Sequence, residues 1–324
     1  MREETIGISV VVPSFNQGRF IEDTLNSLLE QKYPALEILV VDGGSSDDTV
    51  ERLTTYGDRI RWISERDNGQ TDAIIKGFAQ TRHPWLTWLN SDDVQCGDAL
   101  WRVAERIAAE PSVEVVVGGG HYMAADGEFL RDYPTIAVHG PMSVRDEIFH
   151  KGYVAQPSVF FRRDVYDAIG GLNPNLNFCM DYDLWARLAV HGANFARIHA
   201  DLSGNRWYET TKTAGQTLAL YAEIIATQHR VFRAVSPYFV QAVSDHLYSR
   251  FHSPVFGDQA HLFHRWLYFK AVWLALNASH PWYCLRGLVT ATIAKSGPVT
   301  GDTLTPSDWI RSVRAMWLAR GSKP

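Results

Sequence analysis

Cysteine is scarce in this 324-residue sequence, which contains only Cys96, Cys179 and Cys284. No two of them form a CxxC pair, and an odd number cannot be fully paired in disulfide bonds within one chain. Such a sparse set argues against a disulfide-stapled fold and against a structural zinc site. We therefore expect the protein to work in a reducing, cytoplasmic setting.

Long apolar runs are also missing. The first residues lack the apolar segment of a signal peptide, and no stretch reaches the roughly 18–20 uncharged apolar residues that a membrane-spanning helix needs. The nearest approach, 271–285, is bounded by Lys270 and Arg286 and is interrupted by His280 and Pro281. The sequence therefore predicts no membrane span.

Several well-known motifs are absent. The sequence has no GxGxxG, no GxxxxGK[ST], no HExxH and no GxSxG, which argues against the common dinucleotide, P-loop, zinc-protease and hydrolase sites. The twelve histidines show no spacing typical of metal ligands. No nucleic-acid-binding motif is present either, and most of the chain is acidic, so we expect no nucleic acid partner.

Charge is unevenly distributed. From residue 216 onward, eight Arg and three Lys face five acidic residues, which gives this tail a net charge of +6. Because the whole chain carries −5, the remainder carries −11. The tail is also rich in aromatic residues, so we predict two regions with different roles: a domain over 1–215 and a helical, basic region over 216–324.

Within the first region, apolar runs alternate with helical patterns. Strands are predicted near 8–12, 36–41, 60–63, 85–89 and 113–117, and helices follow several of them, beginning near residues 21 and 71. This alternation predicts βαβ units and a mostly parallel sheet. Ligands of such sheets bind at the carboxyl ends of the strands, so the polar loops beginning at Pro13, Asp42 and Asn90 are expected to line one site.

The acidic turn at 90–93 follows the apolar run WLTWL directly. Its paired carboxylates, Asp92 and Asp93, would suit Mg²⁺ or Mn²⁺ bound beside substrate phosphates. The alternative is a solvated turn, in which aspartate is common. The position of the pair at a strand end favours the metal site.

Other carboxylates have two interpretations. Asp42 ends a predicted strand, where it is either a hydrogen-bond acceptor for a base or ribose or an ordinary turn residue. Asp181 and Asp183 begin a predicted helix, where they are either a general base or capping residues. The run Ser46 to Asp48 is better explained by helix capping than by ligand binding.

In order along the chain, six segments resemble the family 2 glycosyltransferases of the inverting GT-A type. They are VVVPSFNQGRFIEDTLNSLLEQ, EILVVDGGSSDDT, DNGQTDAIIKGF, WLTWLNSDD, QPSVFFRRDVYDAIGGLNPNL and MDYDLWARL, and the resemblance covers about residues 7–213. It implies a nucleotide-diphospho-sugar transferase fold, α/β and Rossmann-like, with a mostly parallel sheet flanked by helices. A helical C-terminal region would follow this catalytic domain.

The resemblance also implies site residues. The metal, Mn²⁺ or Mg²⁺, would be held by Asp92 first and Asp93 second. Asp181 would be the catalytic base. Donor contacts would come from Pro13, Phe15, Asn16, Asp42, Asn68, Gln70, Asp72, Asn90, Ser91, Arg206 and Lys212. Two positions depart from the family pattern: Asn90 replaces an acid, and Tyr208 replaces a histidine that helps to bind the metal or the diphosphate.

The implied reaction transfers a sugar from a nucleoside diphosphate, UDP being the expected nucleotide, to a hydroxyl of a glycan or lipid-linked glycan. Asp181 would take the hydroxyl proton, and the metal would neutralise charge on the leaving diphosphate. Two alternatives remain: a nucleotide-sugar-binding protein that has lost catalysis, supported by Asn90 and Tyr208, and a nucleotidyltransferase, whose glycine-rich signature is missing.

The basic tail has two interpretations. Helices expected at 261–276 and 281–294 combine tryptophans with Arg and Lys, which is typical of contact with anionic lipid, so a peripheral position at the inner face of the cell membrane is one hypothesis. The other is a helical subdomain that packs its aromatic residues against the protein itself or a second subunit.

Overall fold

The computed structural model describes residues 5–138, 140–208 and 217–243. The chain divides into two compact units, one formed by 1–148 with 152–214 and the other by 149–151 with 215–324. The predicted tail helices at 261–276 and 281–294, and the predicted donor contact Lys212, lie outside the described residues. The described part of the second unit contains helix α9 (Thr217–Phe232).

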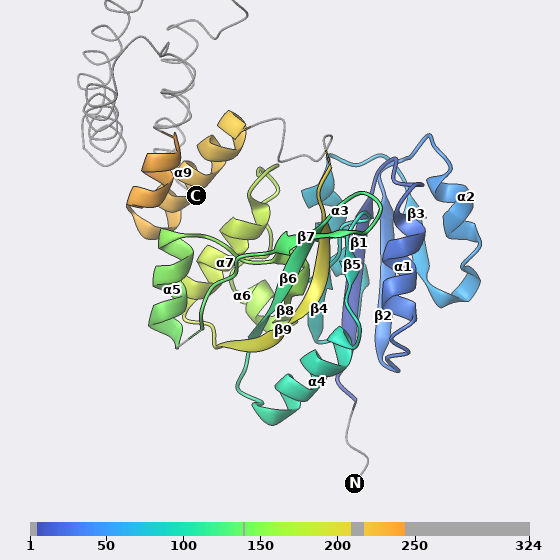
Figure 1. The fold of residues 1–324 in the computed structure, drawn as a ribbon, viewed down its shortest axis with the longest axis horizontal. Coiled ribbons are helices and arrows are strands. Elements are labelled where there is room, and N and C mark those ends of the chain that lie inside the picture. The colour runs from blue at the N-terminus through green and yellow to red at the C-terminus, as the bar shows by residue number, and fades with distance from the viewer. Residues whose placement is uncertain (1–4, 139, 209–216, 244–324) are drawn as a thin grey trace, which may run out of the picture. The chain divides into compact units, whose positions relative to one another are not determined.

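The first unit is built on one nine-stranded mixed sheet with the order β3-β2-β1-β4-β8-β6-β9-β5, and β7 pairs with β6 (Figure 1). Its strands are β1 (Ile8–Ser14), β2 (Leu36–Asp42), β3 (Arg61–Ser64), β4 (Trp85–Trp88), β5 (Val94–Gln95), β6 (Val115–Met123), β7 (Phe129–Asp132), β8 (Val159–Arg162) and β9 (Phe195–Arg206). The four strands β1 to β4 are parallel, as the sequence predicted.

Helices cover both faces of this sheet (Figure 1). They are α1 (Ile21–Leu29), α2 (Thr49–Thr54), α3 (Gln70–Gln80), α4 (Ala99–Ala109), α5 (Pro141–His150), α6 (Arg163–Ala168) and α7 (Met180–His191), with short 3₁₀ turns η1 (Gly57–Arg59) and η2 (Gln156–Ser158). In the part of the chain that the structure describes, no helix is long and apolar enough to cross a membrane.

Alternation along β1 separates two cores. Ile8, Val10 and Val12 are fully buried in a cluster with apolar residues of α1, α2 and α4. Val11 points to the opposite face, where a Cβ on Gly77 of α3 would lie 2.4 Å from it. Because successive side chains of a strand point to opposite faces, a strand buried on both faces reads as a continuous apolar run.

The second core is aromatic. Trp88 at the end of β4 stacks on Trp185 of α7, with ring centroids 5.6 Å apart, and meets Phe161 and Phe78 edge-on. These side chains are almost completely buried. This core therefore packs α7 against β4, the strand that leads into the acidic turn.

Strand β1 runs further than predicted. Pro13, expected to end the strand, pairs with Val41 of β2, and Ser14 pairs with Asp42. On its other side, β1 pairs with β4 only as far as Val11. Proline has no N–H to donate, and it is tolerated at position 13 because the pairing with β4 has already ended there, so no hydrogen bond of that ladder is lost.

The glycine run 118–120 lies inside β6, and β9 is a strand that the sequence analysis did not predict. The two strands approach unusually closely: a Cβ on Gly118 would lie 2.4 Å from the Leu202 side chain. Glycine is therefore needed for close backbone approach within the sheet, and the register between β6 and β9 shifts at these residues.

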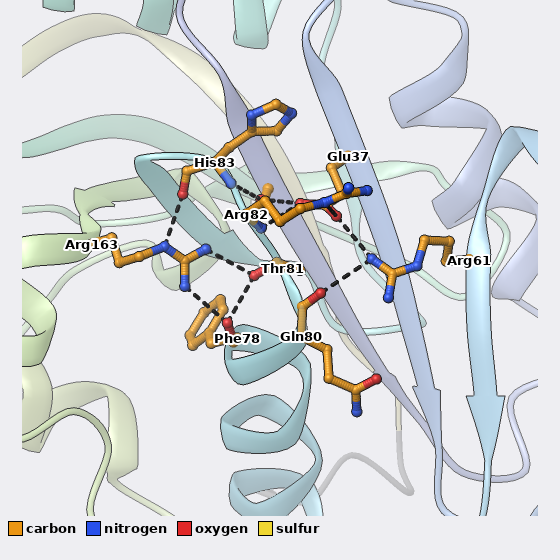
Figure 2. A network of polar contacts seen from close by, with 9 residues as sticks. Glu37, Arg61, Phe78, Gln80, Thr81, Arg82, His83 and Arg163 are labelled. Atoms are coloured by element: carbon orange, nitrogen blue, oxygen red, sulfur yellow. Dashed lines mark hydrogen bonds and ion pairs between the residues drawn. The ribbon is translucent and has the colours of Figure 1, made fainter.

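Figure 2 shows a polar network at the amino-terminal edge of the parallel strands. Glu37 accepts hydrogen bonds from Ser9 Oγ, Arg61 and the backbone of Arg82. Beside it, Arg163 donates to the carbonyls of His83 and Phe78 and to Thr81 Oγ1. Arg163 thus ties the start of α6 to the carboxyl end of α3.

We expect Arg163→Ala to lower the free energy of unfolding by about 1–3 kcal/mol, because it removes three hydrogen bonds from a cationic group. Arg82→Ala in the same network is the control, since the Arg82 side chain is 81% exposed and should contribute less than about 0.5 kcal/mol. Urea unfolding of both variants measures the difference, and equal effects would contradict this role for Arg163.

Candidate active site

The loops after β1 and β2 form the first part of the site. The amide of Asn16 donates to Ser45 Oγ at 2.7 Å, and Asn16 Oδ1 accepts the amide of Ser46 at 2.9 Å. Asn16 has a positive φ of 52°, a conformation in which asparagine is among the less strained residues. Phe15 next to it is 59% exposed, so its ring is presented to solvent at the carboxyl edge of the sheet.

Asp42 lies at the end of β2 and is completely buried. Its carboxylate accepts hydrogen bonds from Ser45 Oγ at 2.5 Å and Ser64 Oγ at 2.6 Å, and from the amides of Gly44 and Ser45. Asp42 therefore holds the loop 43–46 in shape, which agrees with the turn-residue alternative of the sequence analysis.

The start of α3 contributes the next residues. Asp72 accepts the amide of Asn68 at 3.0 Å and forms an ion pair with Lys76 at 3.3 Å, so it holds the turn that leads into the helix. Asn68 is exposed. Gln70 donates from Nε2 to Asn90 Oδ1 at 2.7 Å, which connects this helix to the acidic turn.

In the acidic turn, Asn90 links Gln70 to a buried carboxylate. Its Nδ2 donates to Asp93 Oδ2 at 3.0 Å, while the amide of Arg206 donates to Asp93 Oδ1 at 2.8 Å. Ser91, the residue after Asn90, is buried. Burial, together with the charge of Asp92, raises the pKa of Asp93 well above its usual range. An acidic residue at position 90 would place a second negative charge next to the Asp93 carboxylate. Asn90 instead donates a hydrogen bond to it, which explains why an amide is favoured at this position.

Asp92 is the more accessible of the two carboxylates. Burial raises its pKa, and the hydrogen bond from Tyr208 Oη to Asp92 Oδ2, 2.7 Å long, acts in the opposite direction. Burial and the negative charge of Asp92 also raise the pKa of Tyr208. Tyr208, at the position where the family resemblance implied a histidine, is therefore a protonated donor to the carboxylate.

Arg206 fastens the turn to two other segments. Its guanidinium donates to the carbonyls of Asp92 and Ala125 and to Asp23 Oδ2, and it lies over the ring of Phe20 at 4.6 Å. The Arg206 side chain is only 4% exposed. Its donors point into the protein, so its position fits a supporting role better than a direct contact with a diphosphate.

The two aspartates of α7 have different surroundings. Asp183 is fully buried and forms an ion pair with Arg187 at 2.7 Å. Asp181 is partly exposed in the first turn of the helix, where its Oδ1 accepts the amide of Tyr182 at 2.7 Å. Unpaired amides at a helix N-terminus stabilise negative charge, so this position favours the ionised carboxylate, which is the form of Asp181 that can accept a proton.

Tyr133 is a residue that the sequence analysis missed. Burial raises its pKa well above the usual range, and the charges of Tyr122, Asp181 and Asp93 add to the effect. Gln156 is a second residue that the sequence analysis missed: it donates to the Trp88 carbonyl and contacts Asn90. Tyr133 belongs to none of the six family-like segments. Gln156 opens one of them, QPSVFFRRDVYDAIGGLNPNL, but its contact with Asn90 forms only on folding.

The carboxylates of the acidic turn are the candidate ligands for a divalent cation. Within residues 5–138, 140–208 and 217–243, no group of three or more His, Cys, Asp or Glu side chains is arranged to hold a metal. Mg²⁺ and similar ions are commonly held by one or two carboxylates together with substrate phosphates. Asp92 fits this pattern as a single outward carboxylate, whereas both oxygens of Asp93 accept internal hydrogen bonds.

Comparison with known proteins agrees with this architecture. Residues 9–170 match Glycosyl transferase family 2. This match spans half of the chain, and the chain therefore belongs to Glycosyl transferase family 2.

Among related sequences, the putative teichuronic acid biosynthesis glycosyltransferase TuaG of Bacillus subtilis is 28% identical over 232 residues, which cover 67% of this chain and 88% of TuaG. An uncharacterized glycosyltransferase of Rickettsia conorii is 25% identical over 201 residues, covering 60% of this chain. The chain spans only 33% of the length of that protein.

Two solved structures share the fold. S. aureus TarS 1–349 in complex with UDP-GlcNAc superposes with a TM-score of 0.58 at 14% identity, covering 97% of this chain and 92% of TarS 1–349. The mannosyltransferase PcManGT of Pyrobaculum calidifontis, in complex with GDP-Man and Mn²⁺, gives a TM-score of 0.56 at 16% identity, covering 98% and 86%. The predicted GT-A-like fold is thus confirmed: a mostly parallel sheet flanked by helices.

Proposed function

We propose that this glycosyltransferase moves a sugar, with inversion at the anomeric carbon, from a nucleoside diphosphate to an acceptor hydroxyl. The observation that carries the proposal is the pairing of two different carboxylates at one sheet edge: Asp92, tied to Tyr208, and Asp181 in the first turn of α7. Trp88, two residues before the acidic turn, stacks on Trp185 of α7, the helix that begins with Asp181 in its first turn. A base and a leaving-group site therefore share one region.

The donor is proposed to bind over the loops after β1 and β2 and the start of α3. The exposed ring of Phe15 offers a stacking surface for a nucleobase. Exposed Asn68, together with Asn16, Gln70 and Ser91, would border the ribose and phosphates, while Asp42 acts by holding the loop 43–46 in shape. Donors of TarS and PcManGT, UDP-GlcNAc and GDP-Man, are the first candidates.

In the proposed reaction, Asp181 accepts the proton of the acceptor hydroxyl as its oxygen attacks the anomeric carbon. Asp92 would hold Mn²⁺ or Mg²⁺, which when bound neutralises negative charge on the diphosphate. Asn90, Asp93 and Arg206 keep the turn carrying Asp92 in place through the hydrogen bonds described above. This division places the proton acceptor and the leaving-group charge on different elements, α7 and the β4 turn.

The acceptor is proposed to be a glycan or lipid-linked glycan of the cell surface. The supporting observation is that relatives include TuaG and a PGL/p-HBAD biosynthesis glycosyltransferase of Mycobacterium bovis, which is 25% identical over 180 residues. A cytoplasmic enzyme whose basic tail contacts the inner face of the membrane would suit such an acceptor.

A donor panel tests the proposal. The protein is incubated with Mn²⁺ and, separately, with UDP-, GDP- and dTDP-sugars, and nucleoside diphosphate release is measured. We expect release from at least one donor, with dependence on the cation. Tight donor binding without release would instead support a binding protein that has lost catalysis, and pyrophosphate release from a nucleoside triphosphate with a sugar phosphate would support a nucleotidyltransferase.

We expect Tyr208→Phe to weaken Mn²⁺ binding by about tenfold, because partners that hydrogen-bond a metal-binding carboxylate typically contribute 10–100-fold to affinity. The phenol holds Asp92 Oδ2, so that Asp92 would offer its other oxygen to a cation. Electron paramagnetic resonance of free Mn²⁺, in the presence of UDP, measures the affinity without relying on activity. Unchanged affinity in the phenylalanine variant would contradict this positioning role.

A further inference from the structure

Helix α1 carries three polar side chains to which no role has been assigned above. Thr24, Ser27 and Gln31 are spaced at i, i+3 and i+7, so they follow one side of the helix and of the turn just beyond its end. Thr24 is completely buried, and Gln31 is buried as well. Because buried polar groups are normally hydrogen-bonded, their partners show what this polar strip holds in place.

Ser27 and Gln31 bind the chain that follows the acidic turn. Ser27 Oγ accepts the amide of Gln95 in β5 at 3.0 Å, and Gln31 Oε1 accepts the amide of Leu100 in α4 at 2.8 Å. The paired residues are 68 and 69 positions apart in the chain, so the two bonds keep nearly the same register. The polar strip therefore lies alongside the segment that leads from the acidic turn into α4.

Thr24 reaches the acidic turn itself. Its Oγ1 donates to the carbonyl of Asp93 at 2.7 Å, in a contact between buried groups. The amide of Asp93 donates to the carbonyl of Asn90 at 3.0 Å, and the carbonyl of Asp92 accepts Arg206 Nε at 2.8 Å. Three successive backbone groups, the carbonyl of Asp92 and the amide and carbonyl of Asp93, are thus held directly after the Asp92 side chain.

Helix α1 supports the turn at a second point, which is weaker. Asp23 Oδ2 accepts a hydrogen bond at 3.1 Å from the guanidinium of Arg206, whose Nε binds the Asp92 carbonyl. The Asp23 side chain is 60% exposed, and ion pairs with an exposed partner contribute little. The buried hydrogen bond from Thr24 is therefore the main link between α1 and the acidic turn.

We propose that Thr24 is a positioning residue for Asp92: by fixing the Asp93 carbonyl, it holds the preceding carboxylate where a divalent cation binds. A cation held by one protein carboxylate and by substrate phosphates has few protein ligands, so its affinity depends on how firmly that carboxylate is placed. The proposal rests on the proposed function, because it takes Asp92 as the metal ligand. It extends the support of the metal site to helix α1.

Thr24→Val tests this role, because valine keeps the size and branched shape of the side chain and removes the hydroxyl. Mn²⁺ affinity is measured on the full chain by electron paramagnetic resonance of free Mn²⁺ with UDP present, which requires no turnover. We expect Thr24→Val to weaken Mn²⁺ binding by about tenfold, and Thr24→Ser, which keeps the donor, to stay within about threefold of the wild type. Thr24→Ala has the same expected loss as Thr24→Val and replaces it if the valine variant does not fold.

Thr81→Val is the matched control. The Thr81 hydroxyl is also buried and donates to a carbonyl, that of Phe78 at 3.0 Å, but it belongs to the network at the opposite edge of the sheet (Figure 2). Both valine variants should have a lower melting temperature, because each loses a buried hydrogen bond, but only Thr24→Val should bind Mn²⁺ more weakly.

Three results would each overturn the role of Thr24: wild-type Mn²⁺ affinity in Thr24→Val, an equal loss of affinity in Thr81→Val, or no recovery in Thr24→Ser. Failure of the wild-type protein to bind Mn²⁺ in the presence of UDP would be a different result. It would overturn the metal site of the proposed function, and the role of Thr24 with it.

Discussion

Asp181→Asn is expected to lower the turnover number by about 10²–10⁴-fold while donor affinity changes little, because a positioned general base contributes that much to the rate. The asparagine keeps the size of the side chain and still accepts the amide of Tyr182, so the first turn of α7 should persist. Nucleoside diphosphate release gives the rate, and isothermal titration with UDP gives the affinity. A parallel collapse of affinity would move Asp181 from catalysis to donor binding.

Asp183→Asn provides the contrast on the same helix. Asp183 is fully buried in an ion pair with Arg187, and removing one partner of a buried pair leaves the other uncompensated. We expect this variant to have a lower melting temperature, and its activity to fall only in proportion to the fraction of protein that remains folded. An Asp183 variant that is stable but inactive would mean that the two aspartates have been assigned the wrong way round.

Asp92→Asn is expected to reduce Mn²⁺-dependent turnover by about a thousandfold, because a metal that neutralises transition-state charge contributes several kcal/mol. The amide also fails to attract the cation, so Mn²⁺ binding measured with UDP present should fall as well. The hydrogen bond from Tyr208 can be kept by the amide oxygen, and the fold should therefore survive. Cation-dependent turnover at the wild-type rate would exclude Asp92 as the ligand.

Asp93→Asn tests whether Asp93 stabilises the acidic turn or binds the metal ion itself. Both Asp93 oxygens accept hydrogen bonds, from Asn90 and from the amide of Arg206, and an asparagine would turn one acceptor into a donor facing a donor. We expect a lower melting temperature and unchanged Mn²⁺ affinity in the folded protein. A selective loss of Mn²⁺ binding would instead make Asp93 a ligand alongside Asp92.

Strands β1, β2 and β4 of the parallel half could be predicted from the sequence because they are almost entirely buried and read as apolar runs, whereas β3 is a partly exposed strand at the end of the sheet. Pro13 and Gly118 are residues that seldom lie inside strands: Pro13 fits into β1 because it lies beyond the end of the β1–β4 ladder, and Gly118 fits into β6 because Leu202 approaches it closely. Strand β9 was missed because it contains many polar residues, such as Asn205. Its partner strand is also distant in the sequence: Asn205 pairs with Tyr122 of β6, which is 83 positions earlier.

Motifs located the site residues but could not show what each one does. Asp42, Asp93 and Arg206 are charged residues in matching segments, and only the fold shows that they are buried and satisfied by internal hydrogen bonds. The contact between the rings of Tyr122 and Trp207 has no linear signature either, because it joins two distant parts of the chain. Long-range contacts of this kind depend on strand register, which local patterns do not specify.

Hydrolysis of a donor labelled with ¹³C at the anomeric carbon tests the central claim most directly. Water replaces the acceptor, and ¹³C NMR follows UDP-GlcNAc or GDP-mannose in the presence of Mn²⁺ before the released sugar mutarotates. The account predicts that wild-type protein releases the β-anomer first from an α-linked donor, and that Asp181→Asn releases almost none. Release of the α-anomer first, or equal release by the Asp181 variant, would contradict it.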